Sequence, residues 1–550
     1  MTFERNKNTS ILIFLFFFLF TAVTKAQHGA KYWVQFTDKN NVPYSINEPE
    51  KFLSPEAIQR RIKNNCPITE EDLPVSKIYI DSLTNSGVIV KYTSRWFNSA
   101  TIEAFDESKI NSIKNYSFVK AVEKTADALN YKSYILSDKN KVDLTELANP
   151  EISFYGYGYT QIKLENGIAL HQMGFKGKGV RIAIIDVGFH DADIYVSLDS
   201  VRADNRILGT RNFVDIGESV YNAQSHGADV FSIIGANLPG TFVGTAPEAS
   251  FILLCSEDAN SEFPVEEDNW VAAAEYADSA GADVINTSLG YNTFNDPIYN
   301  HSWSDLNGES TRISKAATIA SSKGIIVVIS AGNEGDNSWH YIGVPADAKN
   351  ILTVGATTSD SSRAGFSSFG PSADGRVKPD VMAMGQGVTI EARYSFLTGG
   401  SGTSFSSPII AGLTACLVQA YPNVMNNDIM EAIRLSANNI NNPNPAFGYG
   451  IPDYGKAFDL LKKPGPTSDS SLLLFPNPFG NYIALKISSS YTGSVKISCF
   501  NTMGKLVFEI SRPSAKIIRL QSELQNLKKG IYFFKCNVNT NSWTIKAVKW

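Results

Sequence analysis

Three residues in the middle of the chain have the types that nucleophilic chemistry needs. Asp186 closes the apolar run RIAIID, His226 opens the stretch HGADVFSIIGA, and Ser404 stands in SGTSFSSPIIAG, ahead of a proline and an apolar run. A histidine with a pKa of about 6.5 can take the proton of a serine hydroxyl near neutral pH, and a buried aspartate can orient that histidine. Together the three residues could attack a carbonyl carbon through Ser404.

The position of Ser404 meets a further requirement of this chemistry. A helix is predicted to begin here with Pro408 in its first turn, and its start leaves backbone N–H groups that can hold an oxyanion. Each residue also has an ordinary structural explanation: a carboxylate at a strand end, a capping or core histidine, a hydroxyl that caps a helix. Only the conjunction of the three favours catalysis.

The segment that carries these residues, 150–462, alternates apolar runs with helical stretches. Buried strands are predicted at 180–186, 251–256, 283–290 and 324–332, and helices at 270–281 and 310–324. Continuous apolar, β-branched runs are typical of a parallel sheet that helices cover on both faces. The fold class is therefore α/β, with a doubly wound, mostly parallel sheet. Such sheets bind ligands at the carboxyl ends of their strands, where the three residues are expected.

At these motifs, and over more than half of the chain, the sequence resembles the subtilisin-like serine proteases (subtilases). Matching text includes SHGADV, GTAPEASF, DVINTSLG, SAGNEG and FGYGIPD. The family's order along the chain is Asp, His, Ser. The resemblance implies that Asp186 is the triad acid, His226 the base and Ser404 the nucleophile. It also implies that the Asn333 side chain donates an N–H to the oxyanion beside the Ser404 backbone N–H.

The resemblance further implies a substrate-binding edge and pocket. By this similarity an extended substrate would pair with one edge by strand addition, and a pocket would take the residue before the scissile bond. Gly343 would lie at the pocket base and leave room for a large apolar side chain. The implied residues are Ser288, Leu289 and Gly290 at the edge, and Ala331, Gly332 and Gly343 in the pocket.

Five residues depart from the family's usual pattern: Val187, Ala228, Met384, Phe405 and Ser406. Val187 and Ala228 stand where hydroxyl residues are usual, which predicts weaker hydrogen bonding around the catalytic residues. The other three predict altered packing. The implied triad and oxyanion residues are all present.

Residues 1–26 are predicted to be a signal peptide. Arg5 and Lys7 precede an apolar core at 11–20, and small residues allow cleavage near Ala26. That core is too short to cross a bilayer about 30 Å thick. The chain is therefore expected to be exported.

Residues 27–140 are predicted to form an α+β unit in the order strand, helix, two strands, helix, strand. The first helix is expected in SPEAIQRRIKNN, with Ser54 as N-cap and Pro55 at its first position, and the two strands at 76–92 and 99–105. By position and element order the unit resembles the ferredoxin-like prodomain of subtilases, an intramolecular inhibitor that is cut away, here between about 130 and 152. An unrelated accessory domain is the alternative.

A Pro/Gly/Ser linker at 463–470 leads to residues 471–550, which alternate in period two and predict an all-β sandwich. This tail resembles the sorting domain of the Por (type IX) bacterial secretion system. The resemblance implies contact with the secretion machinery and a secreted or cell-surface location. A substrate-binding β-domain is the alternative.

The net charge and the cysteine content limit the binding partners and disulfide bonds that can be expected. The net charge of −5 argues against a nucleic-acid partner. Cys255 and Cys416 are expected to be core thiols, whereas a bond between Cys499 and Cys536 stays open. The chemistry requires no cofactor. Acidic loops at 190–200 and 257–268 offer oxygen ligands of the kind calcium takes, but the metal stays unassigned.

The sequence thus favours an exported serine endopeptidase, made as a zymogen, that acts on proteins or peptides. The alternative is a catalytically inactive surface or adhesion protein with the same fold. An esterase is disfavoured because no Gly-x-Ser-x-Gly surrounds Ser404.

Overall fold

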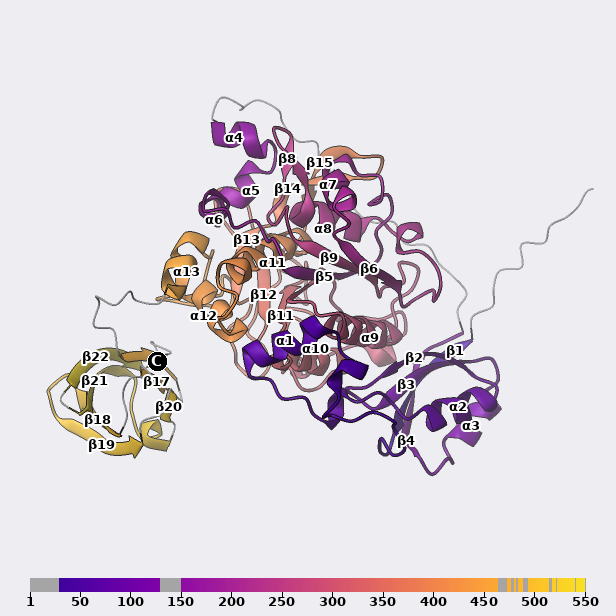
Figure 1. The fold of residues 1–550 in the computed structure, drawn as a ribbon, viewed down its shortest axis with the longest axis horizontal. Helices are drawn as coiled ribbons and strands as arrows, with labels where there is room; N and C mark the ends of the chain where they lie inside the picture. The colour runs from indigo at the N-terminus through magenta and orange to yellow at the C-terminus, as the bar shows by residue number, and fades with distance from the viewer. Residues whose placement is uncertain are drawn as a thin grey trace, which may run out of the picture.

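The structure is a computed structural model that describes residues 29–128, 150–462 and most of 472–549. Within the last range it leaves out 476–478, 481–482, 488–492, 514–516, 521 and 540. The predicted signal peptide, the linker at 463–470 and nearly all of the expected cleavage region lie outside the described residues. Figure 1 shows the arrangement of the elements.

The middle segment is built on a sheet of seven parallel strands in the spatial order β13-β12-β11-β10-β5-β9-β6. This sheet confirms the predicted α/β fold class. The strands are Arg181–Asp186 (β5), Ile207–Asn212 (β6), Ser250–Cys255 (β9), Val284–Thr287 (β10), Ile326–Ser330 (β11), Leu352–Thr357 (β12) and Val381–Met384 (β13). Two short hairpins add Asn237–Leu238 (β7), Phe242–Val243 (β8), Gln386–Ala392 (β14) and Phe396–Ser401 (β15).

Helices cover both faces of this sheet. Ile182 and Ile184 of β5 pack into the core on one face, with residues of α8 and α11, whereas Ala183 and Ile185 pack with α9 and α10 on the other. Because both faces are buried, the strands read as continuous apolar text. The helices are Pro150–Tyr155 (α4), Tyr159–Lys163 (α5), Gly167–Gln172 (α6), Asp199–Ala203 (α7), His226–Gly235 (α8), Val265–Ser279 (α9), Arg312–Ser322 (α10), Thr403–Ala420 (α11), Asn426–Ser436 (α12) and Tyr454–Leu461 (α13).

Helix α11 is the one helix among the described residues whose length and composition would allow it to cross a membrane. Its mean hydropathy over 18 residues is 1.2, yet 83% of that window is buried inside the protein. Ile409, Ile410, Leu413 and Leu417 belong to the core on the α8 face of the sheet. Burial in that core accounts for the apolar sequence of α11.

The N-terminal unit is a four-stranded antiparallel sheet in the order β2-β3-β1-β4, joined in the pattern βαββαβ. That topology is the ferredoxin-like one the sequence predicted. Its elements are Ala30–Phe36 (β1), Lys77–Asn85 (α2), Ile89–Ser94 (β2), Ser99–Ala104 (β3), Glu107–Ile113 (α3) and Val119–Ala126 (β4).

One predicted strand of this unit is wrong in its first half. Residues 77–85 form helix α2, and the strand begins only at Ile89. The alternation of Ile78 and Ile80 suggested a strand, but the buried side chains are Tyr79 and Leu83, four residues apart on one helical face, and Ile78 is exposed.

The predicted first helix is present as α1, Pro55–Asn64, and the Ser54 hydroxyl accepts the Ala57 N–H at 3.2 Å, as an N-cap should. However, α1 is not the helix between β1 and β2 that the βαββαβ fold requires. That role belongs to α2, so α1 is an additional element.

The C-terminal unit is an all-β sandwich, as predicted. Its sheets have the orders β16-β17-β20 and β19-β18-β21-β22 and share one apolar core. The strands are Leu472–Phe475 (β16), Ile483–Ile487 (β17), Ser494–Asn501 (β18), Leu506–Pro513 (β19), Ile517–Leu520 (β20), Gly530–Val538 (β21) and Asn541–Lys549 (β22).

All five cysteines are free thiols, and Cys255 and Cys416 are buried core residues as expected. The bond between Cys499 and Cys536 that the sequence left open is not formed. The two residues lie on neighbouring strands but two positions out of register, since Cys499 faces Phe534 and Cys536 faces Ile497.

A lone carboxyl group lies in the core between α5 and α6. Glu165 is fully buried; one oxygen accepts the Met384 N–H at 3.0 Å, and Oε2 has no hydrogen-bond partner in the described parts of the chain. Burial raises its pKa to about 8. Near neutral pH the group is therefore protonated in the folded protein.

We predict that Glu165 makes stability fall with rising pH. The unfolded chain ionises this carboxyl near pH 4.5, whereas the folded chain keeps its proton up to about pH 8, so stability is lost between these values. Glu165→Gln keeps an acceptor for Met384 and cannot ionise. Calorimetry should show equal stability at pH 4 and an advantage for the variant of up to about 4 kcal/mol at pH 8.

The matched control is Glu218→Gln, which changes an exposed glutamate and should leave the difference from the native protein constant over that range. A stability difference for Glu165→Gln that does not vary with pH would contradict the protonated, buried carboxyl.

Candidate active site

The carboxyl ends of the central strands bring the predicted residues to one edge of the sheet. Asp186 is the last residue of β5, and the segments that follow β10 and β11 begin at Ser288 and Ala331. These three strands are neighbours in the sheet. His226 is the first residue of α8 and Ser404 the second residue of α11, and these two helices pack against each other.

A short hydrogen bond joins Asp186 and His226, the residues predicted to be the acid and the base. The Nδ1 atom of His226 lies 2.7 Å from Oδ1 of Asp186, which also accepts the Val187 N–H at 2.9 Å. Asp186 is fully buried, and its Oδ2 has no hydrogen-bond partner among the residues that the structure describes. An Oδ2 without a partner is consistent with the weaker hydrogen bonding predicted from Val187 and Ala228, whose side chains offer no hydroxyl.

Gly227 allows this close approach. A Cβ atom at residue 227 would lie 2.4 Å from the Gly188 carbonyl oxygen and 2.9 Å from Cβ of Asp186. Any larger residue would push the start of α8 away from the end of β5. The glycine after His226 is therefore a packing requirement of the Asp186–His226 pair.

The surroundings of His226 favour its charged form. Burial lowers the pKa of the imidazole. The negative charge of Asp186 and its hydrogen bond raise this pKa, with smaller contributions from Asp229 and Glu257, and together these effects outweigh burial. The net effect is a pKa above the ordinary 6.5. The ring retains 22% exposure and can therefore exchange protons with solvent or with a bound molecule.

The Ser404 hydroxyl is held by a neighbouring strand end and not by His226. It donates to the Ser288 carbonyl at 3.2 Å, while the Ser288 hydroxyl donates to the Ser404 carbonyl at 2.8 Å. The next residue, Phe405, lies against the imidazole, with ring centroids 5.7 Å apart. Ser404 and His226 thus lie in the same site, and a hydrogen bond between them requires the hydroxyl to turn away from Ser288.

The Asn333 amide is fixed in one orientation. Its Oδ1 accepts the Thr403 N–H at 2.8 Å and the Thr403 hydroxyl at 3.0 Å. Because its oxygen is taken up by Thr403, the Nδ2 group is left as a donor beside the start of α11. The Ser404 N–H, in the first turn of that helix, is a second donor without an intrahelical acceptor.

The residues predicted to bind substrate lie together along this edge. The Gly343 N–H donates to the Ala331 carbonyl at 3.3 Å, and Tyr291, which follows Gly290, exchanges backbone hydrogen bonds of 2.8 and 3.0 Å with Val344. A Cβ atom on Gly343 would lie 3.2 Å from the Tyr291 carbonyl oxygen. The missing side chain of Gly343 thus lets these two segments approach, and its role at a pocket base stays a prediction.

Three polar residues around Ser404 escaped sequence reasoning. Ser407 donates to the Asn286 side chain at 2.9 Å, and that amide donates to the Ser288 hydroxyl at 3.2 Å, which completes a buried chain to Ser404. Thr403 orients Asn333. The available signal was a polar Asn286 within an otherwise apolar strand, and hydroxyls on both sides of Ser404.

The second acidic loop places three carboxylates close together near this site. Glu257, Glu262 and Glu266 each offer an oxygen within 4.8 Å of the others, so these are the described residues that could hold a divalent cation. Both Glu266 oxygens accept backbone N–H groups, and Glu257 accepts the Tyr291 hydroxyl at 2.7 Å. Burial raises the pKa of Glu257 to about 7 and that of Glu262 to about 9.

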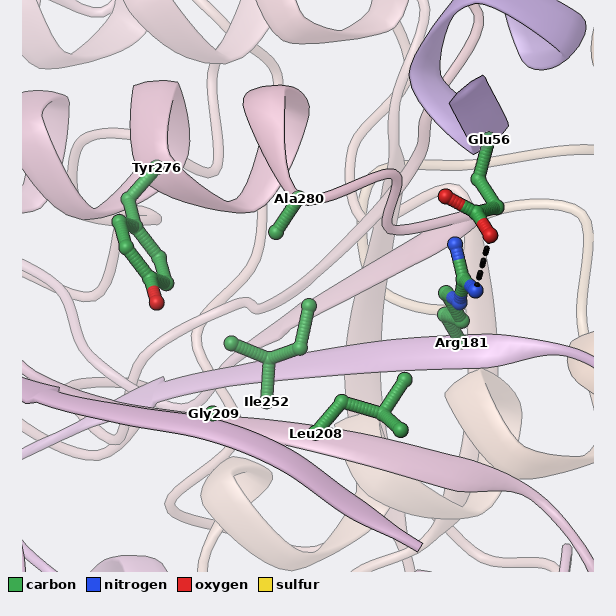
Figure 2. A pocket seen from close by; sticks show the side chains of 7 residues that line it. All are labelled: Glu56, Arg181, Leu208, Gly209, Ile252, Tyr276 and Ala280. Atoms are coloured by element: carbon green, nitrogen blue, oxygen red, sulfur yellow. Dashed lines mark ion pairs between the residues drawn. The ribbon is translucent and has the colours of Figure 1, made fainter. Parts of the chain in front are cut away.

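A cavity of about 150 Å³ lies elsewhere, at the opposite end of the sheet. Figure 2 shows its lining, with Glu56 of α1 paired to Arg181, the first residue of β5. The lining residues are Glu56, Arg181, Leu208, Gly209, Ile252, Tyr276 and Ala280. Since Asp186 is the last residue of β5, this cavity is not part of the candidate active site.

Family models match each of the three parts of the chain. The family model described as "Subtilase family" matches residues 177–450, the "Peptidase S8 propeptide domain, Bacteroidota" matches 31–142, and the "Secretion system C-terminal sorting domain" matches 473–549. These matches indicate a secreted chain with a propeptide and a type IX sorting tail.

Curated relatives include two subtilisins. Subtilisin NAT of Bacillus subtilis subsp. natto is 30% identical over 345 residues, which cover 61% of this chain and 80% of that protein. Subtilisin DY of Bacillus licheniformis is 31% identical over 301 residues, 54% of this chain and 94% of that one. The solved structure titled "Crystal structure of MycP1 with the N-terminal propeptide removed" aligns over 56% of this chain and 98% of its own, with a TM-score of 0.44 and 21% identity.

We predict that Asp186→Asn lowers the pKa of His226, because it removes the largest of the contributions that raise this pKa. The rate of carbethoxylation of His226 by diethylpyrocarbonate, followed against pH, reports this pKa. The His226→Ala protein provides the background from the other five histidines. Asp193→Asn, at an exposed position in the following loop, should leave the titration unchanged, and an unchanged titration in Asp186→Asn would refute the assigned cause.

Proposed function

This chain belongs to the subtilase family, and we propose that it is an active serine endopeptidase that hydrolyses peptide bonds through an acyl-enzyme on Ser404. The hydrogen bond between Asp186 and His226 at 2.7 Å is the observation that carries the proposal. It fixes an imidazole with one nitrogen committed to a buried carboxylate, beside a helix start that presents a serine. A base in this state is what an unactivated hydroxyl needs.

The chemistry follows from the roles of the three residues. In the proposed first step Oγ of Ser404 attacks the substrate carbonyl carbon, and Nε2 of His226 takes the hydroxyl proton. The imidazolium then gives this proton to the leaving amine as the peptide C–N bond breaks, which leaves an ester on Ser404. Water, deprotonated by His226, attacks the ester, releases the acid and restores the hydroxyl. Asp186 stabilises the imidazolium in both halves.

Substrate binding would align the nucleophile. The Ser404 hydroxyl points at the Ser288 carbonyl in the structure, on the edge proposed to pair with an extended peptide. A substrate N–H that donates to the Ser288 carbonyl would displace the Ser404 hydroxyl from it. Rotation of the Ser404 side chain would then direct the hydroxyl to His226. The developing oxyanion would be held by Nδ2 of Asn333 and the Ser404 N–H.

The flanking units fit a zymogen that is exported. The propeptide unit fits an intramolecular inhibitor, and the sorting tail fits recognition by the secretion machinery. We propose that peptides and proteins outside the cell are the substrates and that the cut between about 130 and 152 activates the enzyme.

We predict that a fluorophosphonate probe labels the mature protein on Ser404. Ser404→Ala should lose all labelling and, if maturation is autocatalytic, should also retain the propeptide. Mass spectrometry of the labelled peptide and of the protein termini measures both. Ser401→Ala, an exposed hydroxyl three residues earlier, is the matched control. A folded, mature protein that takes up no probe would favour the inactive surface protein instead.

We predict that Asn333→Ala lowers kcat about 100- to 1,000-fold with little change in KM. The loss of about 2.7–4 kcal/mol that this corresponds to is the value measured for the oxyanion asparagine of a subtilisin, and we expect the same donor to have a similar effect here. Asn441→Ala, at an exposed position, should leave kcat unchanged. A loss confined to KM would place Asn333 in substrate binding and not at the oxyanion.

A further inference from the structure

Helix α1 stands apart from the prodomain in which it lies by sequence. Helices α2 and α3 complete the βαββαβ unit, and the apolar core of that unit is formed by residues outside α1. Figure 1 shows α1 apart from β1–β4. The last residue of α1, Asn64, instead donates to the carbonyl of Gly324, just after α10, at 3.4 Å. The fold of the prodomain sheet therefore does not need α1.

The Arg60 side chain ties α1 to the amino-terminal end of the peptidase sheet. Its guanidinium is 3% exposed and donates to the carbonyl oxygens of Ala282 at 2.7 Å, Asp278 at 3.2 Å and Lys323 at 3.3 Å. It also pairs with the Asp278 carboxylate. Ala282 precedes β10, and Lys323 precedes β11. One side chain thus joins the loops that enter two neighbouring strands.

Arg61 continues the same network. It is 1% exposed and donates to Oδ2 of Asp278 at 2.7 Å, and it lies 3.0 Å from the buried Asp72. Lys323 of the peptidase lies 3.2 Å from Asp72 in turn. Buried charges are tolerated when each has an opposite partner. Here Arg60 and Arg61 share Asp278 of the peptidase, whose carboxylate also pairs with Arg95 of the prodomain, and Arg61 has Asp72 as a second partner.

Both ends of α1 pack closely against glycines of the peptidase domain. A Cβ atom on Gly281 would lie 2.6 Å from Cβ of Glu56, and one on Gly324 would lie 2.8 Å from the Asn64 amide nitrogen. Oδ1 of Asn64 accepts the Asn426 N–H at 2.7 Å. Both glycines have φ of +84°, so a side chain there would be strained as well as crowded.

We propose that α1 is a structural element of the mature peptidase, a base helix that stays bound at the amino-terminal end of the sheet after the prodomain sheet has been removed. The propeptide match spans residues 31–142 and includes α1, so this assignment divides that region in two. Most residues between 40 and 51 and between 65 and 70 are exposed. Cuts in these stretches would free β1–β4, α2 and α3 together with Asp72. The base helix would still be bound through Asp278, the Ala282 carbonyl and Asn426 of the peptidase.

The test uses Ser404→Ala protein, so that cutting does not depend on the chain's own activity. Recognition sequences for a site-specific endoprotease are placed within 44–48, within 67–70 and between 128 and 150. After complete cutting, size-exclusion chromatography in rising urea, with mass spectrometry of each fraction, shows which fragments remain with residues 150–462. Far-ultraviolet circular dichroism reports unfolding of the peptidase.

We expect the sheet fragments to leave first and the base helix to leave only as the peptidase unfolds. The proposal is overturned if the base helix leaves before the sheet fragments, or together with them, while the peptidase is still folded. Because the added endoprotease makes the cuts, either result is independent of whether Ser404 is catalytic.

Matched variants identify the interaction responsible. Arg60→Ala with Arg61→Ala should lower the urea concentration that releases the base helix by roughly 1 M or more. Lys77→Ala removes an exposed ion pair with Asp81 on α2 and should not change it. If the double variant does not fold, Asn64→Ala can replace it. This change removes the side-chain amide that bonds the end of α1 to Asn426 and Gly324, and it should also lower the urea concentration that releases the base helix. If both Asn64→Ala and the arginine variant release the base helix at the same urea concentration as the parent protein, these side chains do not hold α1 on the peptidase.

Discussion

A carboxylate buried at the end of a central strand is stable only when donors cover it, and the site depends on how Asp186 is covered. Its single bonded oxygen accepts the Val187 N–H and lies 2.7 Å from Nδ1 of His226. This requires that β5 end at residue 186 and that α8 begin at residue 226, with a glycine next to it. The rest of the sheet and the α11 core hold those two ends in place.

Much of this arrangement is visible in the sequence. The apolar runs located β5, β9, β10 and β11, and the Ser-Pro pair located the start of α1, because burial on both faces and helix capping leave local signals. Residue type and position singled out Asp186, His226 and Ser404, and the resemblance supplied their roles and the other candidate site residues. It could not supply the contact of the Ser404 hydroxyl with Ser288, since a side-chain rotamer is decided by packing between segments far apart in the chain.

The failures of sequence reasoning have physical causes too. Residues 77–85 alternate like a strand, yet Tyr79 and Leu83 define a helical face whose partner, the prodomain sheet, is remote in sequence. Cys499 and Cys536 share a domain, but strand register keeps them apart. The sequence predicted helix α1 but gave it the wrong position in the fold. No feature of the neighbouring sequence indicates that its arginines are buried against another domain.

Helix α9 shows how the prodomain alters the meaning of polar residues. Glu275 would be expected on a solvated face, but it accepts the Ser94 hydroxyl at 2.5 Å and the Arg95 N–H at 2.8 Å from the prodomain. Asp268 is paired with Arg312, which in turn stacks on Trp33 of the prodomain. One face of α9 is therefore buried by the peptidase sheet and the other by the prodomain.

The apolar sequence of α11 has a consequence for export across the membrane, which precedes folding. An exported chain crosses the membrane before its core exists, and α11, with a mean hydropathy of 1.2 over 18 residues, is long and apolar enough by length and composition to span a bilayer. Hydroxyl residues occupy its first turn, and Pro408 follows as the sixth residue of the helix, one turn later than the sequence predicted. The polar start of α11 that presents Ser404 thus also lowers the tendency of the unfolded segment to remain in the lipid.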